Sequence, residues 1–440
     1  MSSCSEIENS DCSPGRTGRA PKRRKLDERN CRHEATRLKT LSRDDYTLGW
    51  ISALPLELAA ALAMLDETHG DAGKLEMDNN TYTFGTMGGH NCVIACLPAG
   101  VYGHTSATIV ASQMRLSFPS VRFWLLVGIG GGAPTEKVDM RLGDVVVSIP
   151  TSQSPGVIQY DYGKAIGDGV FERTGTLNKP PMLLLTAVSK LQAQHRIEGS
   201  SRMLWLIDEM TSKYPQMRPR YAPRGSRSDV LFEADYDHRE GDGCQNCNRS
   251  FEVRRPARQS CAPVVYYGTI ASANQVMRHA AVRDRLARDL GILCFEMEAA
   301  GLLDNFPCLT IRGICDYADS HKNKEWQEFA AATAAAYAKE LLGVISPTFP
   351  CELQTQQLPI SALQYRRLCL KELQFDCQEQ RRSAIKDTFS ETCTWFLGRP
   401  EFQKWMDSRL LHEHNGFLWI KGKPGTGKST LKFAFENTKQ

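Results

Sequence analysis

The segment Leu293–Asp319 constrains the fold of this chain more than any other stretch. It contains two nearby glutamates, Glu296 and Glu298, and a helical pattern of apolar residues follows the second one. An apolar run rich in β-branched residues then extends over Cys308–Cys315 and is followed by Asp316, which predicts a buried strand with a carboxylate at its end. Open α/β sheets bind ligands at such strand ends, where a carboxylate accepts a hydroxyl hydrogen bond or exchanges a proton.

Strand-like and helix-like patterns alternate over residues 45–346, which predicts an α/β domain whose sheet is covered on both faces. The predicted strands are 46–51, 93–97, 123–127, 145–149, 264–270 and the run before Asp316. The predicted helices are 56–65, 181–191, 204–214, 279–290, 324–342 and one that starts at Glu298. The glycine-rich stretch Gly128–Gly132 follows a predicted strand directly and is expected to be a loop.

Five stretches resemble the purine nucleoside phosphorylase and nucleosidase superfamily, in the order in which that family has them. They are Gly49–Glu57, Ala99–Ala107, Gly128–Gly132, Gly268–Met277 and the segment that contains Glu296, Met297, Glu298 and Asp316. The resemblance covers residues 45–346 and implies a phosphorylase-like mixed sheet flanked by helices. It also implies a homo-oligomer, because a neighbouring subunit often completes the pocket in this family.

The resemblance implies three catalytic residues for cleavage of a purine–ribose bond. Glu57 would orient or deprotonate the attacking water, and Glu298 would bind the ribose hydroxyls. Asp316 would protonate the leaving purine while the sugar passes through an oxocarbenium-like state. Each acid also has a purely structural interpretation, because a glutamate in the first turn of a helix is favoured by the helix dipole and an aspartate at a strand end can cap a turn. The occurrence of all three together favours the catalytic interpretation.

Six further residues are implied in substrate binding: Met297, Gly130, Gly131, Val276, Met277 and Glu296. Met297 would pack under the sugar, and the two glycines would bring backbone N–H groups near ribose or phosphate. Val276 and Met277 would lie against the purine, although ordinary core residues fit there equally well. Glu296 is also a candidate structural partner of Arg312.

Two positions depart from the family pattern. Ile129 stands where many members carry serine or threonine, which removes a hydroxyl donor from the nucleophile site and favours hydrolysis over phosphorolysis. Cys315 replaces the usual serine before the catalytic aspartate, a small change. The expected function is hydrolytic cleavage of a purine nucleoside or nucleotide, with ATP as a candidate substrate. The alternatives are a phosphate-dependent phosphorylase and an inactive domain that senses nucleotides.

A polar insertion at about 190–261 contains the pair Cys244 and Cys247 with His238 nearby. A closed zinc site needs four ligands, so reduced thiols on a surface loop are favoured here, and no cofactor or metal is expected. Four arginines of the insertion are candidate contacts for a polyphosphate: Arg218, Arg220, Arg224 and Arg227.

The C-terminal part differs in character. A linker and helical segment over 347–410 precede a P-loop whose phosphate-binding residues are Gly422, Gly427, Lys428 and Ser429. Residues 411–440 resemble the start of a NACHT domain in fungal NLR-like immune proteins, where a nucleosidase-like effector is fused to an NTPase. Since the chain ends at Gln440, we expect an incomplete NTPase that binds nucleotide poorly and a chain that is a truncated product or a fragment.

Composition adds three expectations. The net charge of +4 does not favour nucleic acid or a membrane as a partner. The polar tail 1–44 is expected to be disordered, and its basic run Pro21–Lys25 fits both a nuclear localisation signal and a solvated charge cluster. Fifteen scattered cysteines, many in apolar runs, are typical of reduced thiols inside a cell, so the cytoplasm or the nucleus is the expected location.

Overall fold

The structure is a computed structural model that describes residues 38–167, 171–198, 201–223, 229–238, 243–258, 260–322, 324–347 and 399–406. The chain divides into two compact units after Pro347, and the described helix of the second unit is α12 (Pro400–Met406). The basic run Pro21–Lys25, the P-loop with Gly422, Gly427, Lys428 and Ser429, and most of the predicted segment 347–410 lie outside the described residues.

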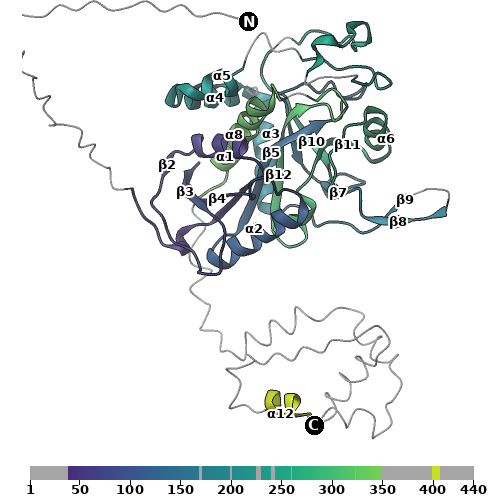
Figure 1. Ribbon diagram of the computed structural model, residues 1–440. Coiled ribbons are helices and arrows are strands. Elements are labelled where there is room, and N and C mark those ends of the chain that lie inside the picture. The colour runs from purple at the N-terminus through teal and green to yellow at the C-terminus, as the bar shows by residue number, and fades with distance from the viewer. Residues whose placement is uncertain are drawn as a thin grey trace, which may run out of the picture. The chain divides into compact units, whose positions relative to one another are not determined.

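A mixed sheet forms the centre of this unit (Figure 1). Its strands are β1 (Leu48–Ser52), β2 (Glu67–Thr68), β3 (Tyr82–Met87), β4 (His90–Cys96), β5 (Phe123–Gly132), β6 (Val145–Ser148), β7 (Val157–Gln159), β10 (Val265–Ser272), β11 (Ile292–Glu296) and β12 (Cys308–Asp316). The order is β11-β10-β6-β12-β5-β1-β4-β3-β2, and β7 pairs with β10. Because β11 also pairs antiparallel with β5, the strands β5, β12, β6, β10 and β11 close into a ring.

Helices cover the sheet on both sides. They are α1 (Pro55–Ala63), α2 (His104–Ser117), α3 (Met182–Glu198), α4 (Ser201–Lys213), α5 (Arg218–Tyr221), α6 (Ala280–Leu290), α7 (Ala300–Leu303) and α8 (Gln327–Val344). A separate pair of short strands, β8 (Gly163–Ala165) and β9 (Phe171–Arg173), projects from the sheet in Figure 1. None of the described helices combines the length and the apolar character that crossing a membrane requires.

The alanine-rich helix α8 is buried along most of its length and packs on β5, β6 and β12. The helix lies close to the sheet where both elements carry small residues. At one such point a Cβ at Gly313 of β12 would collide with the backbone oxygen of Ala330 in α8. α1, α3, α4 and α5 contact α8. The close packing of β12 under α8 fixes the strand that ends on Asp316.

The mixed sheet flanked by helices confirms the predicted fold. The prediction of a loop at Gly128–Gly132 is wrong, because these glycines form the second half of β5. The reason is tertiary pairing: β12 continues along one side of this half-strand and β11 lies along the other. Glycine is required there by close approach, since a Cβ at Gly131 would lie 2.8 Å from Oδ1 of Asp316.

Candidate active site

Glu57 is fixed by backbone donors at the start of α1. Its Oε2 accepts hydrogen bonds from the N–H groups of Ala53 at 2.7 Å and Leu54 at 2.9 Å, and its Oε1 accepts one from Ile129 of β5 at 2.8 Å. The side chain is buried. Burial raises the pKa of Glu57, although Arg312 and the three N–H groups oppose that shift. A carboxylate with a raised pKa is a stronger base, so this group is suited to taking a proton.

Arg312 brings a full positive charge into the middle of β12, where the residue is 0% exposed. Its Nη2 donates to Oε2 of Glu296 and to Oε2 of Glu298, the latter at 3.0 Å. The pairing of Glu296 with Arg312 that the sequence suggested is therefore present. Glu296 ends β11, and its Oε2 also accepts from the backbone N–H groups of Glu298 at 3.1 Å and Ala299 at 3.0 Å.

Glu298 lies in the turn between β11 and α7 and is buried. Burial raises its pKa to about 7; Arg312 opposes this shift, and the neighbouring Glu296 and Glu57 add to it. Burial is the main cause, and the excess of negative charge adds to it, because one guanidinium faces three carboxylates in a place that water barely reaches. Glu298 is therefore poised to gain or lose a proton near neutral pH.

Two nitrogen atoms of Arg312 are not used in these ion pairs. Its Nε and Nη1 are buried without a hydrogen-bond partner among the described residues. A Cβ at Gly128 would collide with both this Nη1 and Oε1 of Glu57, so the donor and the acceptor border the same point of β5. Buried donors are rarely left unsatisfied, so these two nitrogens are unused hydrogen-bonding groups beside the carboxylate of Glu57.

Asp316 is the last residue of β12. The pairing register with β5 shifts between Ile314 and Asp316, so Cys315 forms an irregularity that turns the aspartate toward Gly131. Oδ1 of Asp316 accepts from the N–H of Ala318 at 2.8 Å, and Ala318 has a positive φ of 53°. Backbone outliers of this kind cluster at functional sites.

Lys322 pairs with the carboxylate of Asp316, with Nζ 3.0 Å from Oδ1 and 3.1 Å from Oδ2. The carboxylate of Asp316 is therefore already engaged by Lys322 and by the N–H of Ala318. Lys322 was not predicted as a site residue, because no local sequence pattern marks it. Arg312 did carry a signal, because a charged residue inside an apolar strand pattern needs a buried partner.

The two residues predicted to lie against the purine, Met277 and Val276, differ in burial. Met277 is 8% exposed and packs with the cluster that contains Tyr160, Phe295 and Ala318, next to Asp316. Val276 is 49% exposed and does not belong to that cluster.

Met297 is half-buried between Glu296 and Glu298, and Gly130 and Gly131 lie buried inside β5. The structure thus brings Glu57, Glu296 and Glu298 together around Arg312. It places Asp316 further along the same strand.

The spacing along β5 relates the acid to the base. Glu57 is bound to the N–H of Ile129, and Asp316 lies against Gly131, two positions further on. Glu57 and Asp316 therefore approach β5 at neighbouring positions of the same strand.

His104, at the start of α2, is a buried group that the sequence analysis did not assign. Its Nε2 lies 2.9 Å from Oγ of Ser272, and that oxygen accepts from the N–H of Ala300 at 3.1 Å. Burial lowers the pKa of His104, although Glu296 and Asp161 oppose the shift. The contact joins α2 to the end of β10 and the start of α7.

The insertion arginines are engaged with acids where the structure describes them. Arg218 pairs with Asp208, and Arg220 lies 2.5 Å from Oε1 of Glu328. Arg224 and Arg227 lie outside the described residues.

Comparison with known families decides where this fold belongs. Residues 47–348 match the sequence profile described as "Phosphorylase superfamily". The chain belongs to the phosphorylase superfamily. In the second unit, residues 391–435 match the family described as "Nephrocystin 3, N-terminal". The superfamily match extends over the first unit and includes Glu57, Glu298 and Asp316.

Three known proteins are similar to this chain. A "Nucleotide-binding leucine-rich repeat (NLR)-like protein" of Hyaloscypha variabilis is 46% identical over 319 residues, which are 72% of this chain and 31% of the relative. This chain thus spans about a third of that relative. A "5'-methylthioadenosine/S-adenosylhomocysteine nucleosidase" of Mycobacterium bovis is 24% identical over 313 residues, which are 69% of this chain and 99% of the relative. Futalosine hydrolase of Helicobacter pylori aligns at 17% identity and a TM-score of 0.43 over 68% of this chain and 99% of its own.

Proposed function

We propose that the first unit hydrolyses the N-glycosidic bond of a purine nucleoside or nucleotide. In this proposal Glu57 activates the attacking water and Glu298 accepts hydrogen bonds from the ribose hydroxyls. Asp316 donates a proton to the leaving purine. The reaction needs a base on one side of the sugar and an acid at the leaving group, and both are carboxyl groups here.

The observation that carries the proposal is the shared border of Glu57 and Arg312 at Gly128. Oε1 of Glu57 and the unpartnered Nη1 of Arg312 adjoin one point of β5, so in this proposal a water molecule admitted together with the substrate donates to the carboxylate and accepts from the guanidinium. The base then has a raised pKa and a positioned nucleophile. Asp316 lies against Gly131 of the same strand, so this proposal draws its acid from the end of β12 and its base from the start of α1.

Hydrolysis is favoured over phosphorolysis by the side chain of Ile129. An isoleucine offers no hydroxyl to a phosphate ion, and its backbone N–H is already bound to Glu57. The Mycobacterium bovis relative, matched over 99% of its length, is by its name a nucleosidase of two adenosine thioethers, which supports a purine substrate.

The NLR-like relative suggests the biological setting. Since this chain resembles part of an NLR-like protein at 46% identity, we propose that the enzyme is an immune effector that acts on adenosine or adenine nucleotides such as ATP. The proposed surroundings are the cytoplasm or nucleus. A neighbouring copy of the chain is proposed to complete the pocket.

The test is release of free base from adenosine, ATP and methylthioadenosine by the purified full chain in phosphate-free buffer. We expect at least one of the three substrates to release adenine, which is measured by chromatography at successive times. Added inorganic phosphate should leave the rate unchanged. Release that occurs only with phosphate would show a phosphorylase instead. No release from any of the three under either condition would contradict the enzyme and favour a nucleotide-sensing module.

A further inference from the structure

Four side chains with metal-binding atoms converge next to the strand that ends on Asp316. His238, Cys244 and Cys247 come from the insertion, and His321 comes from the loop after β12, 74 residues from Cys247. One ligand atom from each residue lies within 4.8 Å of every other. The sequence pattern showed an incomplete set, and folding supplies the fourth member.

The distances between these atoms match a tetrahedral zinc ion. Nδ1 of His238 lies 3.2 Å from Sγ of Cys247 and 4.0 Å from Sγ of Cys244. Nδ1 of His321 lies 3.6 Å from each of the two sulfurs. Zinc bonds of about 2.3 Å to sulfur and about 2.0 Å to nitrogen, at tetrahedral angles, separate nitrogen from sulfur by about 3.5 Å. The four observed separations lie around that value.

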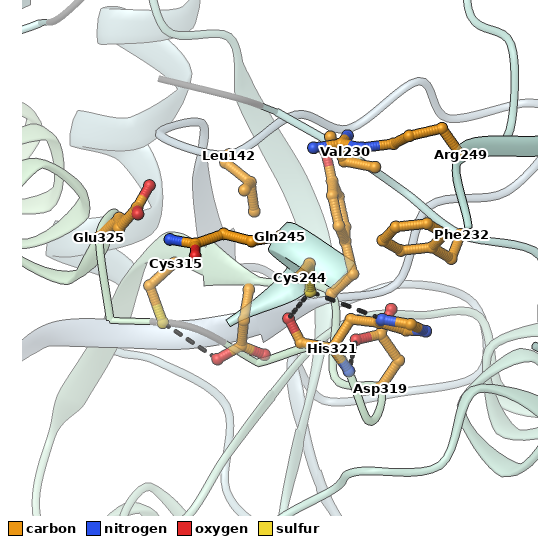
Figure 2. A pocket seen from close by; sticks show the side chains of 12 residues that line it. Leu142, Val230, Phe232, Cys244, Gln245, Arg249, Cys315, Asp319, His321 and Glu325 are labelled. Carbon is orange, nitrogen blue, oxygen red and sulfur yellow. Dashed lines mark hydrogen bonds between the residues drawn. The ribbon is translucent and has the colours of Figure 1, made fainter. Parts of the chain in front are cut away.

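The ring of His321 is held in the orientation that a metal ligand needs. Its Nε2 is 2.8 Å from the backbone oxygen of Tyr236, so Nε2 carries the proton and Nδ1 presents its lone pair to the sulfurs. The ring also stacks on Phe232, with centroids 4.1 Å apart and planes inclined by 25°. Figure 2 shows His321 beside Cys244, with Phe232 close to the histidine.

The two cysteines are arranged for the same purpose. Residues Cys244–Asn246 form a 3-10 turn, and the N–H of Cys247 donates to the backbone oxygen of Cys244 at 3.3 Å, so both side chains turn to one side. Both thiols are free. Two thiolates balance the charge of Zn²⁺, and two neutral imidazoles complete four ligands, which leaves no open position for a substrate.

We propose that His238, Cys244, Cys247 and His321 bind one Zn²⁺ as a closed structural site. The ion fastens the insertion to the loop that follows Asp316. This departs from the sequence-based expectation of reduced thiols on a surface loop. The site stands independently of the proposed enzymatic function, because none of its four residues is assigned to the reaction.

The segment around the cluster is of the kind that a bound metal stabilises. Around the cluster, the described residues 229–238 and 243–258 form short 3-10 turns and an isolated bridge between Phe232 and Glu252. Such loop-rich segments bury little apolar surface and are commonly stabilised by a metal. The N–H of His238 also donates to Oγ of Ser320 at 2.9 Å, which joins the same two segments.

The proposed ion is coupled to the candidate active site through one short loop. His321 precedes Lys322, the partner of Asp316. A cavity of about 130 Å³ is lined by Asp316 and Cys315 on one hand and by Cys244 and His321 on the other. In Figure 2 Cys315 and Glu325 lie across the drawn pocket from Asp319 and His321. Loss of the metal is therefore expected to loosen the position of Lys322.

The experiment measures the metal content of the full chain, expressed with zinc and purified without chelator, by inductively coupled plasma mass spectrometry. We expect about one zinc per chain. Cys247→Ser and His321→Ala should lower this to about a tenth or less after dialysis, because three ligands rarely hold a structural ion. Cys261→Ser is the matched control: this exposed cysteine lies in the same insertion outside the cluster, and its loss should leave the metal content unchanged.

A second measurement does not depend on how well the variants fold. Co²⁺ added to the metal-free wild-type chain should give the visible absorption bands of a tetrahedral ion with thiolate ligands, and Zn²⁺ should abolish them. Wild-type protein with well under about 0.1 zinc per chain and no cobalt bands would overturn the proposal. Loss of metal in Cys261→Ser equal to that in Cys247→Ser would overturn the assignment of ligands.

Discussion

At the scale of single residues, Arg312 organises the candidate site. Burial opposes its charge, but the carboxylates of Glu296, Glu298 and Glu57 more than offset this and raise the pKa of Arg312 well above its usual value. The guanidinium therefore stays charged, and any proton that the cluster takes up resides on a glutamate. Removing Arg312 would leave three buried carboxylates uncompensated, and an uncompensated buried charge commonly costs about 3–5 kcal/mol of stability.

This charge balance predicts a pH-dependent stability that Glu298→Gln removes. The carboxyl of Glu298 has a pKa of about 7 in the folded chain, against an ordinary value of 4.5. Between these values the folded state holds the extra proton, so the free energy of unfolding falls as the pH rises from about 4.5 to about 7. The upper limit of this loss is about 3 kcal/mol.

Urea unfolding of wild type and Glu298→Gln at several pH values between 5 and 8 tests this prediction. The difference in free energy of unfolding between the two proteins should change in favour of the variant as the pH rises. The exposed Glu136→Gln is the matched control. Stability curves of wild type and Glu298→Gln that run parallel across this range would contradict the assignment of the proton to Glu298.

Glu57→Gln tests the proposed base. An amide cannot take a proton from water, so we expect the kcat for base release to fall about 100-fold or more. The variant should also lose about 1–3 kcal/mol of stability, because the amide group faces backbone donors that a carboxylate accepts from. Thermal unfolding must therefore show a folded protein at the assay temperature. A kcat within about twofold of wild type would exclude Glu57 as the base.

At the scale of elements, β5 shows where prediction from sequence succeeded and where it failed. The strand 123–127 was predicted correctly from its apolar run, but Gly128–Gly132 was not, because a glycine run has no side-chain pattern to indicate a strand. The partners that make it a strand, β11 and the end of β12, come from positions far along the chain. β11 itself was missed, since its five residues are too short a run to separate from the helix that follows.

Gly128→Ala tests how much stability is lost when a side chain is added to β5 at this position. The new Cβ would collide with Glu57 and Arg312, so we expect a loss of about 1–3 kcal/mol in the free energy of unfolding and a loss of base release. Gly343→Ala is the matched control, because that glycine lies in α8 with open space around its Cβ. Alanine there should stabilise the protein by up to about 1 kcal/mol. Chemical denaturation of both variants gives the comparison, and equal effects would contradict this account of β5.

The candidate site could be predicted only in part, because some of its residues are marked by local motifs and others only by contacts between distant segments. The three acids Glu57, Glu298 and Asp316 were assigned through motifs that resemble a family. Their shared partner Arg312 and the proposed metal ligand His321 depend on tertiary contacts. Local spacing carries no information about such contacts, as His321 and Cys247 are 74 residues apart. The structure was needed to bring them together.

At the scale of the whole molecule, a phosphorylase-superfamily unit is followed by a segment that matches the nephrocystin 3 N-terminal family. The Hyaloscypha variabilis relative contains about three times the length that this chain matches, with 31% of it covered. The proposed effector role therefore concerns the enzyme in a larger architecture, and the chemistry of the first unit is the part that can be tested directly.

The most direct test of that chemistry compares the full wild-type chain with Asp316→Asn in phosphate-free buffer, by following adenine release from adenosine and from ATP. The account predicts release by the wild type and a rate lower by about 100-fold or more in the variant, because asparagine cannot protonate the leaving purine. The variant should keep the unfolding midpoint of the wild type to within a few degrees. Equal rates in the two proteins, or no release by the wild type on either substrate, would contradict the proposal that Asp316 serves a nucleosidase.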